Sequence, residues 1–156
     1  MNPNHPQSYQ TYMKENLFDK TNIYPSNCQF PDRNVQSYEQ RLKGIPADLC
    51  ILGIGTNGHI AFNEPGSSFD SRTRVVHLDE QTIHDNSRFF DSIEDVPTQA
   101  ITMGLGTIMD SKRIVLMANG KNKFEILNTA MNGEVTEDVP ASILQKHDNV
   151  EVFYCD

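Results

Sequence analysis

Short apolar runs separated by polar, proline-rich or amphipathic stretches set the pattern of this chain. Residues 48–54 (DLCILGI) and 113–118 (RIVLMA) are nearly continuous apolar runs. Runs of this length are typical of strands that are buried in a parallel sheet. Residues 74–78, 99–103 and 150–154 show a weaker form of the same pattern. We therefore predict five strands.

Amphipathic or capped stretches between and before these strands predict helices. The predicted helices cover residues 9–19, 34–42 and 121–131, with a further short helix opened by Pro140. Ser8 is a suitable N-cap for the first of them, and Gly133 is a suitable stop for the third. Strands that alternate with helices predict an α/β fold in which helices cover both faces of the sheet.

Length and charge limit the classes of protein and of partner. A chain of 156 residues can bury its own core, so we expect residues 1–156 to form a single domain. The 13 Lys and Arg against 21 Asp and Glu give a net charge of −8, and no basic stripe stands out. Nucleic acids and anionic membrane surfaces are therefore poor partners.

The start of the chain and its cysteines predict where the protein resides. No apolar run approaches the roughly 18 residues of a membrane span, and residues 1–10 contain neither a basic nor an apolar signal region. Cys28, Cys50 and Cys155 are scattered and odd in number, which argues against a disulfide framework and against a thiolate metal site. We therefore expect a reduced, cytoplasmic setting.

A glycine-rich segment directly follows the first apolar run. Gly53, Gly55 and Gly58 satisfy the G-x-G-x-x-G pattern, and Asp79 lies about 20 residues further on, as in dinucleotide-binding folds. That motif needs a helix that starts at its last glycine. Here Pro65 and the following Gly-Ser-Ser interrupt the chain too soon for a crossover helix. We therefore reject the dinucleotide interpretation.

The same segment carries groups that can move a proton. Open α/β sheets bind ligands at the C-terminal ends of their strands, where this loop is expected to lie. His59 can exchange a proton near neutral pH, Glu64 is close enough to reach its ring, and Asn57 can orient it. The alternative is that Asn57 and His59 only satisfy backbone groups of the loop, and the spacing alone leaves both interpretations open.

Residues 53–65 read GIGTNGHIAFNEP and resemble the signature of the glucosamine-6-phosphate deaminase (isomerase) family. Further matching segments are residues 5–9, 71–74, 86–90, 96–97, 101–104 and 120–123. The resemblance implies a three-layer α/β/α, Rossmann-like fold with a mostly parallel sheet. It also implies conversion of glucosamine 6-phosphate and water to fructose 6-phosphate and ammonia. The sister 6-phosphogluconolactonases resemble the chain less, because they have no glutamate at the place of Glu64.

The resemblance implies a role for each of five residues in this sequence. Asn57, His59 and Glu64 match the group that opens the sugar ring, in which His59 moves a proton between the ring oxygen and the anomeric hydroxyl. Arg88 and Lys123 match residues that hold the substrate phosphate, although without the resemblance each would more often be an ordinary surface residue. The expected partner is a small-molecule sugar phosphate, and the family chemistry requires neither a metal nor an organic cofactor.

Two parts of the family pattern have no match in these residues. One is a Gly/Thr-rich phosphate loop, and the other is an Asp-Glu-Tyr segment whose Asp removes the C2 proton. We therefore expect the chain to be the C-terminal portion of a deaminase/isomerase domain, without the N-terminal strands. Little or no deamination is expected from it alone. A non-catalytic sugar-phosphate-binding protein is the main alternative, and a 6-phosphogluconolactonase relative is less favoured.

Regulation is a further point of departure from the family. Hexameric, activated members pair an Arg like Arg74 with a Lys two residues later, where this chain has Val76. Ser67 and Arg74 are present, but half of the anion clamp is missing. We therefore expect no activation by N-acetylglucosamine 6-phosphate, and we leave open whether the chain forms a homo-oligomer.

Overall fold

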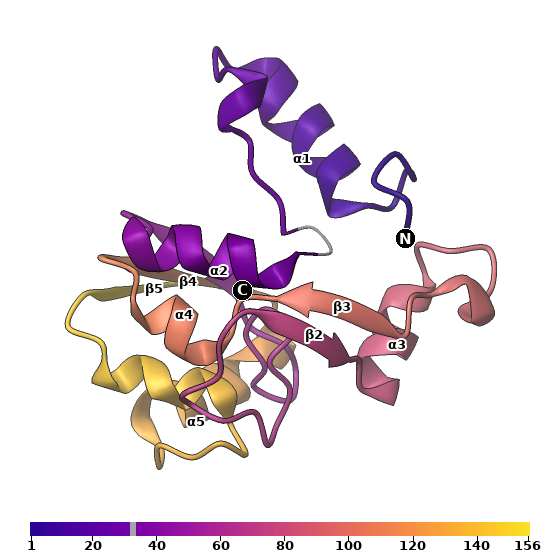
Figure 1. The fold of residues 1–156 in the computed structure, drawn as a ribbon. Coiled ribbons are helices and arrows are strands. Elements are labelled where there is room, and N and C mark those ends of the chain that lie inside the picture. The colour runs from indigo at the N-terminus through magenta and orange to yellow at the C-terminus, as the bar shows by residue number, and fades with distance from the viewer. Residues whose placement is uncertain (32–33) are drawn as a thin grey trace.

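A three-stranded parallel sheet organises the computed structural model, which describes residues 1–31 and 34–156 (Figure 1). Its strands are β1 (Cys50–Gly53), β4 (Ile114–Asn119) and β5 (Val150–Cys155), in the order β1-β4-β5. The central strand β4 pairs in parallel with both neighbours, so that Leu116 lies opposite Leu52 on one side and Val152 on the other. The prediction of a mostly parallel α/β sheet is confirmed.

One face of this sheet carries the core. The helices that contribute buried residues to it are α4 (Leu105–Met109), α5 (Phe124–Asn132) and η5 (Pro140–Lys146). Ile114 and Leu116 of β4 are fully buried there, together with Leu127 of α5 and Leu144 of η5. Figure 1 shows α4 and α5 on the same side of the sheet. The apolar run at residues 113–118 therefore contributes to the core.

The opposite face of the parallel sheet is less covered than predicted, because the sequence analysis expected helices on both faces. Successive side chains of a strand point to opposite faces, so the residues that alternate with the core face the other way. Among them Ile51 is 64% exposed, Met117 53% and Phe153 55%. In the described part of the chain, helices therefore bury one face of this sheet, and the second face keeps apolar side chains at the surface.

The two weaker strands in the middle of the sequence form a sheet of their own. Strands β2 (Arg74–His77) and β3 (Gln99–Thr102) pair antiparallel and do not join the parallel sheet. The helix α3 (Glu80–Ser87) lies between them in the sequence and was not among the predicted helices. Asp79 caps it by accepting a hydrogen bond from the backbone N–H of Gln81. Its polar sequence buries only Thr82, so it lacks the apolar stripe that sequence analysis relies on.

The N-terminal helices agree with the sequence in position, with small differences in length. They are α1 (Tyr9–Asn16) and α2 (Val35–Gly44), with the short 3-10 turns η1 (Phe18–Lys20) and η2 (Pro25–Asn27) between them. Ser8 caps α1 as predicted. Figure 1 shows α1 on the side of the molecule away from α5, and α1 buries none of its residues. No helix within 1–31 and 34–156 is long and apolar enough to cross a bilayer.

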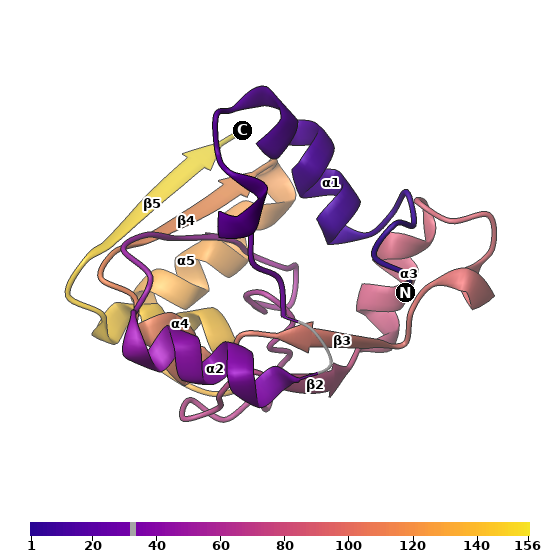
Figure 2. The same cartoon turned by 45° about the horizontal axis from the view of Figure 1, so that its top comes forward.

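A buried carboxylate joins α2 to the rest of the fold. Glu39 of α2 is 8% exposed and accepts hydrogen bonds from Arg72 Nε (2.6 Å), Thr107 Oγ1 (2.9 Å), and the backbone N–H and hydroxyl of Thr73 (3.1 and 2.5 Å). Figure 2 shows α2 lying beside α4, to which Thr107 belongs. Burial raises the pKa of Glu39, but these hydrogen bonds outweigh it and lower the pKa to about 2. Glu39 is therefore a charged cross-link between α2, α4 and the segment before β2.

Candidate active site

Two backbone hydrogen bonds to residues 137 and 141 hold the loop that follows β1 in place. Residues 54–73 contain no helix, in agreement with the rejection of the dinucleotide motif. Gly58 has a φ of +86°, and its carbonyl accepts a hydrogen bond from the backbone N–H of Ala141 in η5 at 2.9 Å. Further along, the N–H of Gly66 donates to the carbonyl of Glu137 at 2.9 Å. The polar residues of this loop therefore sit on a fixed backbone at the C-terminal end of β1.

The loop brings Asn57, His59 and Glu64 into direct contact. Asn57 Nδ2 donates to Glu64 Oε2 at 2.9 Å, and Asn57 Oδ1 lies 2.7 Å from His59 Nδ1. The distance from His59 Nδ1 to Glu64 Oε2 is 3.2 Å. The side chain of His59 is 22% exposed and that of Glu64 14%, so both are partly buried and the imidazole is the more exposed of the two. The structure thus joins three residues that the sequence proposed together.

The hydrogen-bond pattern decides which ring nitrogen of His59 is available. Because Nδ2 of Asn57 donates to Glu64, the amide presents its oxygen to His59 Nδ1. A carboxylate and an amide oxygen only accept, so the hydrogen of the neutral ring is on Nδ1. Nε2 then keeps a free lone pair. The arrangement is that of a general base oriented by a carboxylate and an amide.

Glu64 is strongly held in its charged form. Its partial burial raises the pKa, but hydrogen bonds from His59, Thr82 and Asn57 outweigh that effect and lower the pKa to about 2. Thr82 Oγ1 of α3 contributes a short bond of 2.5 Å to Glu64 Oε1. A carboxylate that remains charged stabilises positive charge on the adjacent imidazole. Glu64 therefore faces the imidazole as a fixed negative charge.

The His59 ring lies directly against the backbone of Gly55. The backbone N–H of Gly55 donates to the His59 carbonyl at 2.9 Å. A Cβ added to Gly55 would lie well inside van der Waals distance of three ring atoms of His59. The ring position therefore depends on the absence of a side chain at this glycine.

Gly55→Ala is accordingly expected to displace the imidazole and to lower any turnover at this site by roughly 10²-fold, the effect of a misplacement of about 1 Å. A crystal structure of the variant and the loss of turnover are the measurements. Gly44→Ala is the matched control, because a Cβ at Gly44 meets no atom within 4 Å. An unmoved His59 ring in Gly55→Ala would contradict the prediction.

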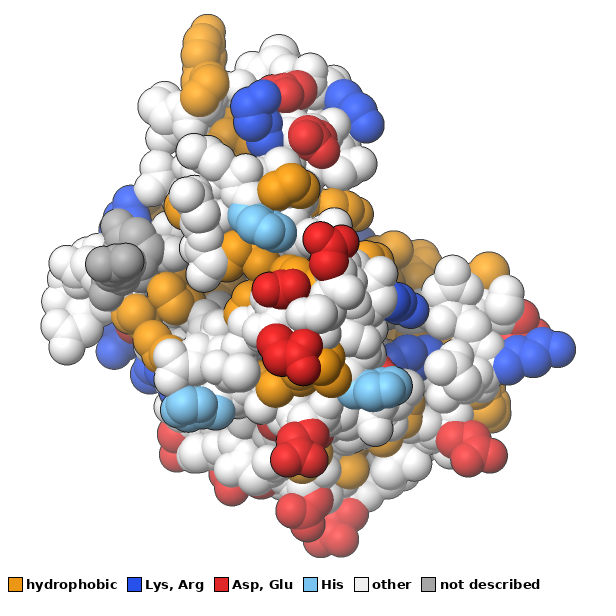
Figure 3. All heavy atoms as spheres, turned by 90° about the vertical axis from the view of Figure 1, so that its right-hand side faces the viewer, with side chains coloured by type: hydrophobic (Ala, Val, Ile, Leu, Met, Phe, Trp, Pro, Cys, Tyr) orange, Lys and Arg blue, Asp and Glu red, His pale blue; other side chains and the backbone are white. Residues whose placement is uncertain are grey.

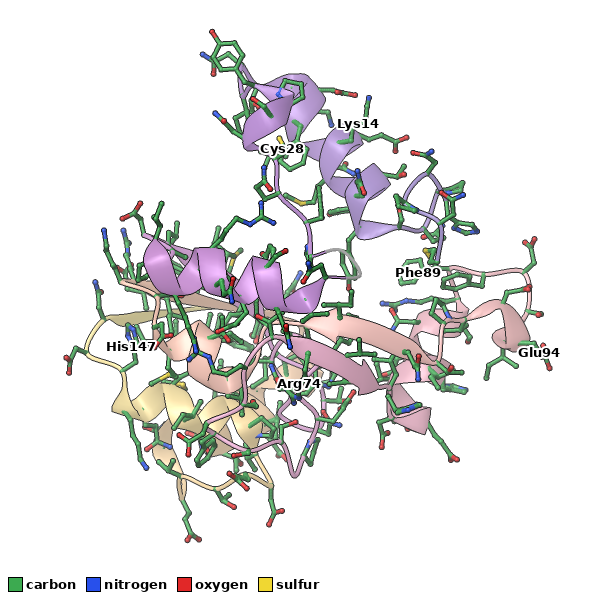
Figure 4. All side chains as sticks on the ribbon, in the orientation of Figure 1. Lys14, Cys28, Arg74, Phe89, Glu94 and His147 are labelled. Atoms are coloured by element: carbon green, nitrogen blue, oxygen red, sulfur yellow. The ribbon has the colours of Figure 1, made fainter. Side chains whose placement is uncertain are left out.

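The two predicted phosphate ligands lie on elements near the cluster. Arg88 directly follows α3, is exposed, and its guanidinium lies 4.8 Å from the ring centroid of Phe89. Lys123 precedes α5 and is partly buried; burial lowers its pKa, and the charge of Asp85 on α3 opposes this. Lys123 therefore lies close enough to α3 to sense one of its charges. Figure 4 shows Phe89 next to the N-terminal segment, where Phe90 also stacks on His5 at 6.2 Å.

The acidic side chains on the face where α3 lies bear on the predicted role of Arg88 and Lys123. Figure 3, seen from the side on which α3 lies, shows acidic side chains gathered over the centre and lower part of this face. An anion reaching this face therefore needs local cations to hold it. Arg88 and Lys123 are candidates for that role, and the role itself stays a prediction.

Arg74 uses its guanidinium within the fold. It donates to Asn63 Oδ1 at 2.9 Å and to Ser67 Oγ at 3.3 Å, and burial lowers its pKa. Figure 4 places Arg74 over the loops that follow β1. Val76, on the same strand, offers no charge to complete an anion clamp. The expected lack of activation by N-acetylglucosamine 6-phosphate stays a prediction.

The sequence analysis did not identify Thr82, which contacts the cluster through Glu64. Thr82 is 4% exposed and bonds to Glu64 from 18 residues away, on a helix that was not predicted. The only signal for that helix was Asp79 followed by Glu80, a common helix start. Within residues 1–31 and 34–156, no group of three or more His, Cys, Asp and Glu is placed to hold a metal ion.

The fold and the cluster together define an α/β protein in which a histidine, an asparagine and a glutamate meet beyond the C-terminal end of a parallel strand. Comparison with known families agrees: the model of the family described as glucosamine-6-phosphate isomerases/6-phosphogluconolactonase matches residues 1–153. The chain belongs to this family.

Several curated relatives share one name. The chain is 47% identical to a glucosamine-6-phosphate deaminase of Exiguobacterium sibiricum, over 97% of this chain and 62% of the relative. It is 48% identical to that of Staphylococcus haemolyticus (100% and 68%) and 52% identical to that of Streptococcus uberis (96% and 66%). The chain thus spans about two thirds of the length of these relatives.

Solved structures support the same fold. A monomeric glucosamine-6-phosphate deaminase superposes with a TM-score of 0.95 at 43% identity, over 99% of this chain and 68% of that one. A 6-phosphogluconolactonase from Thermotoga maritima superposes with a TM-score of 0.75 at 19% identity, over 100% of this chain and 68% of that one. The second likeness shows the fold alone.

Proposed function

We propose that Asn57, His59 and Glu64 open the ring of glucosamine 6-phosphate, as a step in its conversion with water to fructose 6-phosphate and ammonia. The observation that carries this proposal is the His59 ring, whose Nδ1 is held by an amide oxygen and a carboxylate while Nε2 keeps its lone pair. The names of relatives at 47–52% identity support the substrate.

Ring opening needs one proton to change oxygens. His59 Nε2 takes the proton of the anomeric hydroxyl, and the electrons of that O–H bond form the C1 carbonyl. The bond between C1 and the ring oxygen breaks, and its electrons go to the ring oxygen, which takes the proton back from Nε2. A single imidazole can serve as base and then as acid, because it exchanges protons near neutral pH.

Glu64 and Asn57 support the charged ring between these two steps. The imidazolium forms 3.2 Å from Glu64 Oε2 and donates from Nδ1 toward Asn57 Oδ1. Because hydrogen bonds lower the pKa of Glu64 to about 2, the carboxylate stays negative and does not compete for the proton. The same contacts fix the direction in which Nε2 points.

The phosphate of the substrate is proposed to bind between α3 and the start of α5. Arg88 has the planar fork that suits a phosphate, and Lys123 supplies a compact charge. The burial of Lys123 strengthens its interaction with an anion. The three free cysteines among the described residues fit a reducing compartment, and we place this activity in the cytoplasm.

The lactonase alternative has weaker support. Structures of 6-phosphogluconolactonases share only 18–22% identity with the chain. Glu64, which a ring-opening cluster needs, is hydrogen-bonded into the site rather than facing solvent. The deaminase chemistry therefore accounts for the contacts better.

The experiment measures ring opening directly. The α and β anomers of glucosamine 6-phosphate interconvert only through the open chain, so exchange between them reports ring opening without the later proton transfer at C2. We expect the purified chain to accelerate anomer exchange, followed by NMR saturation transfer. Release of ammonia and fructose 6-phosphate, and hydrolysis of 6-phosphogluconolactone, are measured beside it.

Each outcome distinguishes one of the candidate functions. Faster exchange supports ring opening, and release of ammonia shows the complete reaction. Saturable binding of the sugar phosphate without faster exchange would contradict the proposal and favour a non-catalytic binding protein. Lactone hydrolysis that exceeds both would favour the lactonase.

A further inference from the structure

We propose that Thr82 is a positioning residue for ring opening: its hydroxyl holds one oxygen of Glu64, so that the other oxygen faces Asn57 and His59. The inference rests on the proposed function for its kinetic consequence, while the contact itself belongs to the fold. It assigns a role to α3 besides placing Arg88 at its C-terminal end.

The two oxygens of Glu64 have separate partners. Oε1 accepts the hydroxyl of Thr82 at 2.5 Å. Oε2 accepts Asn57 Nδ2 at 2.9 Å and lies 3.2 Å from His59 Nδ1. Because both ends of the carboxylate are fixed, its plane cannot rotate. Thr82 therefore fixes the orientation in which the carboxylate faces the amide and the imidazole.

The helix makes the Thr82 hydroxyl a rigid donor. A threonine inside a helix often bonds to the carbonyl four residues before it, but here the hydroxyl turns to Glu64. The branched Cβ restricts the side chain to few rotamers. The Thr82 carbonyl is itself bonded by Asn86 Nδ2 at 2.7 Å, and the helix is capped at Asp79. With 4% exposure, water does not replace the hydroxyl easily.

Removing this hydroxyl is expected to affect chemistry more than binding. In Thr82→Val the shape of the side chain remains, but Glu64 loses one of its donors. Hydrogen bonds to charged groups are strong enough that the maximal rate of anomer exchange should fall roughly 10- to 100-fold, with little change in KM. Thr82→Ser keeps the hydroxyl and should restore most of the rate.

A second measurement does not depend on turnover. The side-chain carboxyl of Glu64 is followed by ¹³C NMR as the pH is changed. Three hydrogen bonds lower its pKa to about 2, so Thr82→Val should raise the pKa of Glu64 toward its ordinary value of 4.5, and Thr82→Ser should leave it low. A purely structural role of Thr82 would lower stability without moving this titration.

Thr107→Val is the matched control. Thr107 is a buried threonine whose hydroxyl donates to a different carboxylate, that of Glu39, at 2.9 Å. Its replacement removes the same kind of bond outside the site. It should lower the urea midpoint and leave both anomer exchange and the Glu64 titration unchanged. If Thr82→Val does not fold, Thr82→Ala, which adds no apolar bulk beside the carboxylate, takes its place.

The two measurements separate failure of this proposal from failure of the proposed function. If the unaltered chain does not accelerate anomer exchange, the proposed function fails, and the Glu64 titration alone decides about Thr82. A raised Glu64 pKa in Thr82→Val that is low again in Thr82→Ser supports the positioning role. An unchanged titration in a folded Thr82→Val or Thr82→Ala variant overturns it, whatever the turnover.

Discussion

His59→Gln is expected to lower the acceleration of anomer exchange in glucosamine 6-phosphate by about 10²- to 10⁴-fold, the usual contribution of a general acid or base. Glutamine can still donate a hydrogen bond toward Asn57 or Glu64, but it cannot take a proton from the anomeric hydroxyl. The loop around Gly58, tied to η5 through its carbonyl, should keep its fold. The rate is measured by NMR saturation transfer at several substrate concentrations.

His77→Gln is the control, because His77 is exposed and bonds only to Gln99 on the neighbouring strand among the hydrogen bonds described for it. It should retain the full rate. Since the pKa of Glu64 is about 2, Glu64 stays charged between pH 4 and 9, and changes in rate across that range will not come from its titration. Full activity of His59→Gln would remove the imidazole from the mechanism.

Glu39→Gln is expected to lower the free energy of unfolding by about 3 kcal/mol at pH 7, which corresponds to the drop of its pKa from 4.5 to about 2. Glu39 accepts from four donors in Arg72, Thr73 and Thr107, whereas an amide has a single acceptor oxygen and turns an NH₂ group toward those donors. Urea unfolding followed by circular dichroism measures the loss.

The stabilisation that Glu39 contributes should decrease as the pH falls. The folded-state pKa of Glu39 is depressed, so its contribution is complete above about pH 4.5 and is lost as the pH falls toward about 2. The difference between the unaltered chain and Glu39→Gln should therefore shrink below pH 4.5. Asp110→Asn removes the other, half-exposed partner of Arg72 and should lower stability by no more than about 1 kcal/mol. A difference that is constant from pH 7 to pH 3 would contradict the assignment.

The elements that sequence analysis identified are those with a strong local signal. The apolar runs at 48–54 and 113–118 became β1 and β4, and the Ser8 cap became the start of α1. Residues 74–78 and 99–103 contain strands as predicted, but their antiparallel pairing in a separate sheet was not foreseen. A strand's own residues indicate extended backbone, whereas its partner depends on packing elsewhere.

In the candidate site, too, the sequence identified residues that are close together in the chain and missed one from a separate element. Asn57, His59 and Glu64 lie within eight residues of one loop, so their spacing already predicted a cluster. Thr82 comes from another element, and no pattern in the sequence indicated that α3 would bring its hydroxyl to Glu64. The catalytic and phosphate-binding roles stay predictions, to be tested by the variants above.

The sequence by itself determined the parallel strands, the grouping of Asn57, His59 and Glu64 in the loop after β1, and the likeness to sugar-phosphate deaminases, because each of these depends on neighbouring residues. Only the tertiary structure showed the contact between Thr82 and Glu64 and the hydrogen bonds that keep Glu39 charged. These depend on contacts between residues that are up to 68 positions apart, such as Glu39 and Thr107. Such contacts form only when the whole chain packs, and local sequence patterns do not contain them.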